Sequence, residues 1–286
     1  MPVRRSPGHA RPRTHLAQGD RFGAAEVEQR GRDADAIRSA GIEPVILDIT
    51  KSEQVEALAA RVAGDPRALH ALVNNAGISV NAPVEALPLA QWRWVFEVNL
   101  FGQVAVTQAL LPALLRDKGG VINISSVGGK VAMATYGAYA GTKFALEAVS
   151  DALRREVAPL GVQVVVVEPG GVRTEMGTRG VATAKSLAGQ MTPAQDERYG
   201  SLVQAITAQM TSGTGSRVTA DAAARVIAKA VTTRRPRTRY TIGGDAALIT
   251  RLTRLLSDRT LDRVITANLR RHYPEGATAA HLSSGH

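Results

Sequence analysis

Short runs of apolar, β-branched residues alternate with longer amphipathic segments through the middle of the chain, and this alternation restricts the fold more than any other feature. The strongest run is 162–168, which contains four consecutive valines. Shorter runs of the same kind occupy 44–48, 71–75, 121–126 and 239–242. Continuous runs are typical of strands that are buried on both faces of a sheet.

Helical patterns fill the intervals between these runs, at 52–62, 89–116, 139–160 and 219–232. Alternating strands and helices predict an α/β fold, a doubly wound parallel sheet with helices on both faces. Ligands of such sheets bind beyond the carboxyl ends of the strands. Polar residues gather at those predicted ends, namely Asp48, Asn74, Asn75, Ser125, Ser126 and Glu168.

The chain divides by composition into three parts. Residues 1–32 are rich in Arg, Pro, Gly and His and have no strand or helix period, so we expect a disordered segment. Residues 33–243 form the α/β domain, and 244–286 form a basic helix, expected over 246–271, with a small-residue tail. That helix could lie on a membrane surface or dock on the domain, and we expect it to dock.

Composition limits the partners of the chain. A net charge of +10 can indicate nucleic acid, but only 4% of the residues are aromatic, so we expect no nucleic-acid partner. We see neither an apolar run that would span a bilayer nor a secretory signal, so we expect a cytoplasmic protein without membrane contact. The absence of cysteine excludes disulfide, zinc–thiolate and cysteine-nucleophile sites, and we expect no metal.

Five motifs follow one another on the expected elements: Asn74-Asn75-Ala76-Gly77, Asn99-Leu100-Phe101-Gly102, Ser126, Tyr139-Ala140-Gly141-Thr142-Lys143 and Pro169-Gly170-Gly171-Val172-Arg173-Thr174. In this order they resemble the short-chain dehydrogenase/reductases, NAD(P)-dependent enzymes with a Rossmann-type fold. Each motif alone is weak, but the ordered set is specific. The C-terminal segments 237–240, 244–246 and 255–259 resemble the branch with 17β-hydroxysteroid and retinol dehydrogenases.

The resemblance implies that Tyr139 exchanges a proton with the substrate oxygen. A free tyrosine has a pKa of about 10, too high for efficient acid–base work at neutral pH. Lys143 lies one helical turn away on the same face, and its charge, with that of oxidised nicotinamide, would favour the phenolate. In the family this lysine also holds the nicotinamide ribose. On spacing alone, the two residues could instead be a surface pair.

Other catalytic and substrate residues carry alternatives. The family spacing to the tyrosine selects Ser126 to bind the substrate oxygen, and Ser125, on the opposite face, would be a buried hydroxyl bonded to backbone. Tyr136 lacks a lysine four residues on, so it would line the substrate pocket with Met133, unless both merely pack. The family uses Asn99 to hold a water that links the lysine to solvent, whereas an exposed helix position is the simpler interpretation.

The family pattern also assigns cofactor contacts. Asn75, Ala76 and Gly77 would let the backbone approach the adenosine side, and Asp48, with Ile49 beside it, would contact adenine, unless Asp48 caps a helix. The other predicted contacts with the nicotinamide side are Pro169, Gly170, Val172 and Thr174. Residues 175–215 are rich in small residues, which fits a mobile lid or a plain flexible insertion.

The N-terminal part departs from the family, which opens with a strand and a glycine-rich turn that cradles the pyrophosphate. Gly8, Gly19, Gly23 and Gly31 are too scattered to form it. Residues 1–32 could derive from a shifted reading frame or misassigned start, which we favour, or the chain could be a divergent product that has lost cofactor binding. The function alternatives are therefore an oxidoreductase and a non-enzymatic remnant.

We expect an oxidoreductase that moves hydride between NAD(P) and a moderately apolar alcohol or ketone, with NAD or NADP left open. Family members commonly pair through the helices that correspond here to 89–116 and 139–160, so a homo-oligomer is possible. A serine hydrolase is not supported, because the sequence has no G-x-S-x-G motif.

Overall fold

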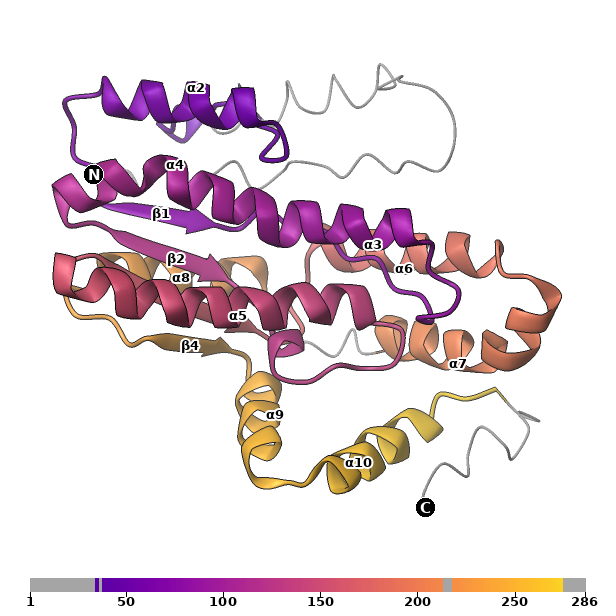
Figure 1. Ribbon diagram of the computed structural model, residues 1–286. Helices are drawn as coiled ribbons and strands as arrows, with labels where there is room; N and C mark the ends of the chain where they lie inside the picture. The colour runs from indigo at the N-terminus through magenta and orange to yellow at the C-terminus, as the bar shows by residue number, and fades with distance from the viewer. Residues whose placement is uncertain (1–33, 36–37, 213–217, 275–286) are drawn as a thin grey trace.

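Four parallel strands form the sheet in the computed structural model, which describes residues 34–35, 38–212 and 218–274 (Figure 1). The strands lie side by side in the order of the chain. They are β1 (Ala71–Asn74), β2 (Gly120–Ile124), β3 (Gln163–Pro169) and β4 (Arg239–Ile242). This arrangement confirms the predicted α/β fold. The predicted N-terminal segment 1–32 lies outside the described residues, as does the tail from residue 275.

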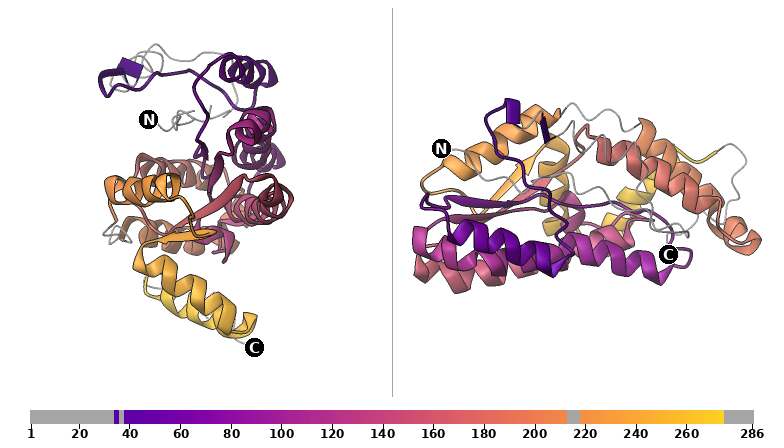
Figure 2. Two further views of the ribbon diagram at one scale, coloured as in Figure 1. Left: turned by 90° about the vertical axis from the view of Figure 1, so that its left-hand side faces the viewer. Right: turned by 90° about the horizontal axis from the view of Figure 1, so that it is seen from above.

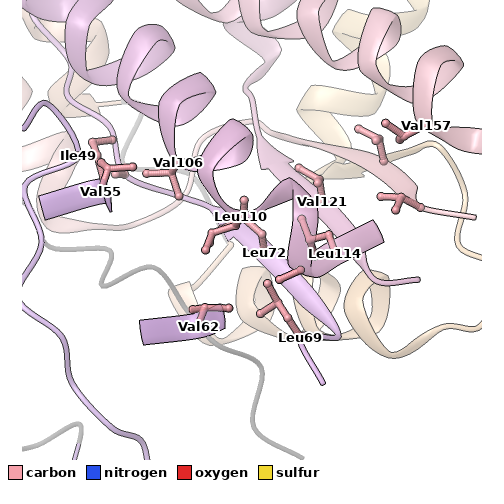
Figure 3. Close-up of a cluster of buried hydrophobic side chains, with 14 of the residues drawn as sticks. Ile49, Val55, Val62, Leu69, Leu72, Val106, Leu110, Leu114, Val121 and Val157 are labelled. Atoms are coloured by element: carbon pink, nitrogen blue, oxygen red, sulfur yellow. The ribbon is translucent and has the colours of Figure 1, made fainter. Parts of the chain in front are cut away.

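Helices cover both faces of the sheet, as Figure 2 shows in its end-on view. On one face lie α2 (Ser52–Ala63), α4 (Gly102–Asp117) and α5 (Gly137–Val157), and on the other lies α8 (Ala220–Thr232). Successive residues of β3 serve the two cores, because Val164 packs with the first group and Val165 with α8. The first core contains Leu72, Leu110 and Val121 (Figure 3).

The helix between β1 and β2 contains a π-helical turn. It comprises α3 (Leu89–Phe96), the π turn Glu97–Phe101 and α4, in agreement with the predicted helix 89–116. Contrary to the expectation from sequence, Leu89–Asp117 is long and apolar enough to cross a membrane by length and composition alone. However, 56% of its apolar window is buried inside the fold, as in the core helix of a globular domain.

The predicted strand 44–48 is wrong, because this segment has no regular structure. It does alternate in burial: Leu47 and Ile49 are buried in the first core, whereas Ile46 is 72% exposed. A strand requires a ladder of hydrogen bonds to a neighbour. None of the described residues forms a ladder with this segment, and within the described part of the chain β1 pairs only with β2.

The segment between β3 and α8 is helical where it is described. It forms α6 (Glu175–Ala188) and α7 (Pro193–Ser212), which pack together as a helical pair. The small residues that suggest a flexible segment therefore belong mostly to helices. Figure 1 places the pair beyond the carboxyl ends of the strands, where the site lies.

The predicted single C-terminal helix over 246–271 is wrong, because two helices occupy this region. They are α9 (Gly244–Leu255) and α10 (Asp258–Arg270), which extend from the domain in Figure 1. Leu256 adopts extended backbone angles, and Ser257 begins the next helix as its N-cap residue. Serine favours that position, and Asp258 follows in the first turn, where negative charge is favourable. Docking is confirmed for α10, which packs against α7 through Leu269.

Candidate active site

Tyr139 and Ser126 meet where β2 leads into the α5 region. Tyr139 is the third residue of α5, and Ser126 lies two residues beyond β2. The two side chains lie close together, because both approach Gly128 and the Ser126 hydroxyl counteracts the rise in the pKa of Tyr139. The Ser126 hydroxyl also accepts from the Gly128 backbone nitrogen at 3.0 Å and lies 3.5 Å from the Pro169 carbonyl. Backbone from two elements therefore fixes the hydroxyl against the phenol.

Lys143 lies one turn after Tyr139 on α5, and 5% of its surface is exposed. Its Nζ atom donates to the Ile124 carbonyl oxygen at 2.8 Å and lies 5.8 Å from the centroid of the Tyr139 ring. The structure thus brings Ser126, Tyr139 and Lys143 together. They do not form an exposed pair on the helix surface.

Burial dominates the electrostatics of this group. It raises the pKa of Tyr139, and the hydrogen bond with Ser126 opposes this effect. Burial also lowers the pKa of Lys143 to about 8, against the opposing influence of the Glu147 carboxylate. The expectation that Lys143 depresses the tyrosine pKa is therefore not met by the protein side chains alone, because burial of the phenol dominates and the opposing influence comes from Ser126.

Asn99 lies in the π turn and is fully buried, so the interpretation as an exposed helix residue is wrong. Its Oδ1 accepts from the Ile78 backbone nitrogen at 2.7 Å, and its Nδ2 donates to the Ile78 carbonyl at 2.8 Å. The same Nδ2 is 3.2 Å from the Thr142 hydroxyl of α5. A side-chain amide thus ties the loop after β1 to the helix that carries Tyr139. π turns are frequent at functional sites.

The rival residues take other positions. Ser125 is buried, but its hydroxyl has no hydrogen-bond partner among the described residues, so the expected bond to backbone is not present. The ring of Tyr136 meets that of Tyr139 edge to face, with centroids 6.4 Å apart. Burial, and secondarily the charge of Tyr139, raise the pKa of Tyr136 to about 12. Met133 is half-buried, and its carbonyl accepts from the Tyr136 nitrogen.

The predicted adenosine-side residues follow β1. Asn75 is exposed, whereas Ala76 is buried, and the Ala76 carbonyl accepts from the Gln103 amide at 2.6 Å. A Cβ atom on Gly77 would lie 3.3 Å from the Asn99 Oδ1, which is tighter than an ordinary contact. Glycine at this position therefore permits the close approach of loop and helix.

Asp48 and Ile49 lie at the end of the irregular segment before α2. The Asp48 carboxylate accepts from the Thr50 backbone nitrogen at 3.0 Å and from its hydroxyl at 2.7 Å. Asp48 is not the N-cap of α2, a position that Lys51 occupies. The side chain of Ile49 is buried in the first core, so it is not exposed for a side-chain contact with adenine. The alternative that Asp48 caps α2 is therefore wrong.

The predicted nicotinamide-side residues follow β3. A Cβ atom on Gly170 would lie only 2.7 Å from a carboxylate oxygen of Asp245. The same carboxylate accepts a hydrogen bond from the Gly171 backbone nitrogen at 3.2 Å. Val172 packs beside the second core, and Thr174 is the exposed N-cap residue of α6, without a side-chain capping bond. The Thr174 hydroxyl therefore does not cap α6.

A buried charge network below Lys143 is absent from the sequence prediction. Glu147 on α5 bonds to Lys130 at 2.7 Å and to Arg239 of β4 at 3.0 Å. Arg239 also contacts Glu168 at 3.1 Å and Asp151 at 2.9 Å. Burial, with the nearby Glu147, raises the pKa of Glu168. The spacing 143, 147, 151 along one helix face is the signal that could have revealed it.

The described residues fit contacts with both the adenosine and the nicotinamide sides of a dinucleotide cofactor. The exposed Asn75 and the tight position Gly77 lie at the carboxyl end of β1, and Gly170 and the exposed Thr174 follow β3. Within the ranges that the structure describes, no glycine-rich turn joins a strand to a helix, so none of these residues is assigned to the pyrophosphate.

Known proteins share this architecture. The sequence profile of the short chain dehydrogenase family matches residues 14–185. Retinol dehydrogenase 5 of Mus musculus is 35% identical over 82% of this chain and 76% of that protein. The crystal structure of a short-chain dehydrogenase from Streptomyces avermitilis is 31% identical, with a TM-score of 0.64 over 84% of this chain and 82% of that one. A Burkholderia cenocepacia short chain dehydrogenase in complex with NADP is 25% identical, with a TM-score of 0.59 over 80% and 78%.

Proposed function

The chain belongs to the short-chain dehydrogenase family, and from this membership we propose that it interconverts a moderately apolar alcohol and its ketone, with NAD(P) as cofactor. The observation that carries the proposal is the buried contact of Tyr139 with Ser126, beside Lys143. A bound nicotinamide cofactor would supply or accept the hydride. The proposal covers both NAD and NADP as the cofactor of this protein.

The side chains of this protein would handle the proton and the oxygen. In ketone reduction, the Tyr139 hydroxyl gives its proton to the substrate oxygen, and in alcohol oxidation it takes that proton back. The Ser126 hydroxyl bonds the same oxygen and stabilises the charge that develops on it. Lys143 contributes a buried positive charge close to the phenol, which favours its ionised form during turnover.

Other residues would bind and orient. The exposed Asn75 and Thr174, with the backbone around Gly77, Gly170 and Val172, would contact the cofactor at the ends of β1 and β3. Asp48 and Ile49 would border its adenine side. Tyr136 and Met133 would line the substrate side, where α7 and α10 contribute apolar side chains. The Asn99 side chain would hold the loop after β1 at its distance from α5.

The test combines binding with turnover in the full-length protein. We expect saturable nicotinamide fluorescence on titration with NADH or NADPH, and ketone-dependent oxidation of one of them. Tyr139→Phe should reduce kcat by about 10²- to 10⁴-fold while leaving cofactor affinity nearly unchanged. The matched control is Tyr240→Phe on β4, whose hydroxyl accepts from the Arg237 nitrogen away from this site.

Two outcomes would contradict the proposal. A wild-type protein that binds neither dinucleotide would support the alternative of a folded, non-enzymatic relative. Turnover that survives Tyr139→Phe would mean that another group supplies the proton.

A further inference from the structure

Asn81, in the loop after β1, buries an amide whose donor has only a weak acceptor. Only 2% of its surface is exposed. Its Oδ1 lies 3.2 Å from the Ser79 hydroxyl. Its Nδ2 donates to the Met210 Sδ at 3.9 Å, and no oxygen among the described residues accepts from it. A thioether is a poor acceptor, and an under-bonded buried N–H destabilises the folded state. This amide has the capacity to bind a further oxygen.

Neighbouring contacts place Asn81 beside the substrate side of the site. The nitrogen of the next residue, Ala82, donates to the Thr135 carbonyl at 3.0 Å. Thr135 precedes Tyr136, whose ring meets that of Tyr139. Met210, the partner of Asn81, packs against the same cluster of α7 and α10 side chains as Tyr136. The amide therefore lies next to the side-chain cluster that contains Tyr136 and Met210.

Thr135 provides an independent sign that this corner is specialised. Its φ angle is +68°, which is strained for a β-branched residue. Its hydroxyl is buried and has no hydrogen-bond partner among the described residues. Such strain is concentrated at binding sites, where surrounding structure maintains it. Two polar groups with unused bonding capacity thus lie on adjacent backbone segments.

The side chains packed in this cluster are mostly apolar. It contains Ala205 and Ile206 of α7 and Leu269 of α10, with Leu202 and Tyr273 packed against them. A purely apolar molecule that displaced part of this packing would leave the Asn81 amide without an oxygen. A substrate with a second oxygen would match both the apolar side chains and the amide.

We propose that Asn81 is a second polar subsite, which binds a carbonyl oxygen on the substrate skeleton at a distance from the reacting ketone. This inference rests on the proposed function and narrows its substrate class to apolar ketones that carry another carbonyl group. The flexible Met210 side chain would move aside, because methionine adapts its shape readily. Asn81 would then exchange a sulfur acceptor for an oxygen.

The test compares long-chain methyl ketones that differ only in a second carbonyl, moved along the chain one carbon at a time. Binding is followed by the fluorescence of Trp92 and Trp94, the two tryptophans. Trp92 borders Gly137 at the start of α5 and so reports on this region. For at least one position of the second carbonyl, we expect the wild type to bind the diketone about three- to tenfold more tightly than the monoketone.

Variants separate the subsite from general packing. Asn81→Leu keeps the branched shape of the side chain and removes its polar groups, so it should abolish the preference while retaining monoketone affinity. Asn81→Asp, which replaces the donors by acceptors, should abolish it too and serves if the leucine variant does not fold. Met210→Leu removes the sulfur but leaves the amide, so the preference should persist. Equal loss for both ketones in either Asn81 variant would overturn the proposal, as would a wild type without preference.

Binding and turnover distinguish the two proposals. A preference for the diketone without oxidation of NADH or NADPH would sustain the subsite and remove the proposed reaction. Turnover of both ketones with equal affinity would sustain the reaction and remove the subsite.

Discussion

The ammonium of Lys143 lies 5.8 Å from the centre of the Tyr139 ring, while its hydrogen bond goes to the Ile124 carbonyl. The lysine is therefore anchored by the end of β2, beside the ring of the phenol. An anchored charge keeps its position whether the phenol is protonated or ionised. This arrangement suits a group that must assist both directions of one proton transfer.

The low pKa of Lys143 predicts how stability depends on pH. Its pKa is about 8 in the folded protein and about 10.5 when unfolded, so between these values the unfolded chain binds more protons. Stability contributed by this group therefore rises with pH across that window, by about 3 kcal/mol. Urea unfolding of the wild type and Lys143→Met from pH 7.5 to 10.5 checks this, since the variant should lack the rise. Parallel pH curves would show that the lysine has an ordinary pKa.

The close contact of Gly128 with the Tyr139 ring leads to a prediction about how precisely the ring must be positioned for turnover. A Cβ atom there would lie 3.1 Å from the Tyr139 Cε1 and 3.4 Å from the Ser126 Oγ. Gly128→Ala should displace the ring by a few tenths of an ångström and lower kcat by about tenfold, because proton transfer depends on alignment. Steady-state kinetics measures this. Gly64→Ala, at a helix end with ordinary contacts and φ of −78°, is the control and should keep the wild-type kcat.

The ion pairs of Arg239 predict that its removal lowers the stability of the fold, although it is not one of the reacting groups. Its removal leaves Glu147, Glu168 and Asp151 without one of their cations, so Arg239→Met should destabilise the fold by about 3 to 5 kcal/mol. Denaturant unfolding compares it with Arg235→Met, an exposed residue of the same basic segment, which should change stability by less than about 0.5 kcal/mol. Equal stabilities would mean that Lys130 and Arg154 are sufficient to compensate the three carboxylates.

The contacts of Glu85 with Arg198 and Tyr199 predict that this carboxylate stabilises the position of α7. Its carboxylate accepts from the Tyr199 hydroxyl at 2.8 Å and pairs with Arg198. These two partners lower the pKa of Glu85, so the bond is present above the ordinary carboxyl pKa and is lost as the pH falls through the lowered value. Glu85→Gln should accelerate hydrogen exchange in α7 at pH 7 without a change in the core strands. Glu197→Gln, exposed on the same helix, should exchange like the wild type.

The periodic patterns correctly predicted the strands and helices that pack against other predicted strands and helices. The strands at 71–75, 121–126, 162–168 and 239–242 and their intervening helices are confirmed within a few residues. The segment 44–48 has the same residue types and is not a strand. The residue types of a segment show that it could form a strand. Whether a neighbouring strand is available to pair with it cannot be read from the local sequence.

The site follows a similar division. The spacing along the helix was enough to predict that Tyr139 and Lys143 lie on one face. The order of the motifs, through the family resemblance, predicted that Ser126 and Asn99 belong to the same site. The ion pair of Glu147 with Arg239 joins residues 92 positions apart, and no short pattern encodes that contact. Likewise, the reversal of the expected pKa shift of Tyr139 depends on burial, which emerges only when all the surrounding elements are assembled.

The π turn at Glu97–Phe101 has a consequence for changes in chain length. A π turn holds one more residue than the α-helical turn it replaces. Deleting one amino acid there would return the turn to α-helical winding, and the downstream face of α4 would nearly keep its orientation over the sheet. The backbone around Asn99 would be rewound, although the Asn99 side chain bonds to Ile78 and lies beside Thr142. Loss of one position should therefore harm the link between the loop after β1 and α5 more than the packing of α4.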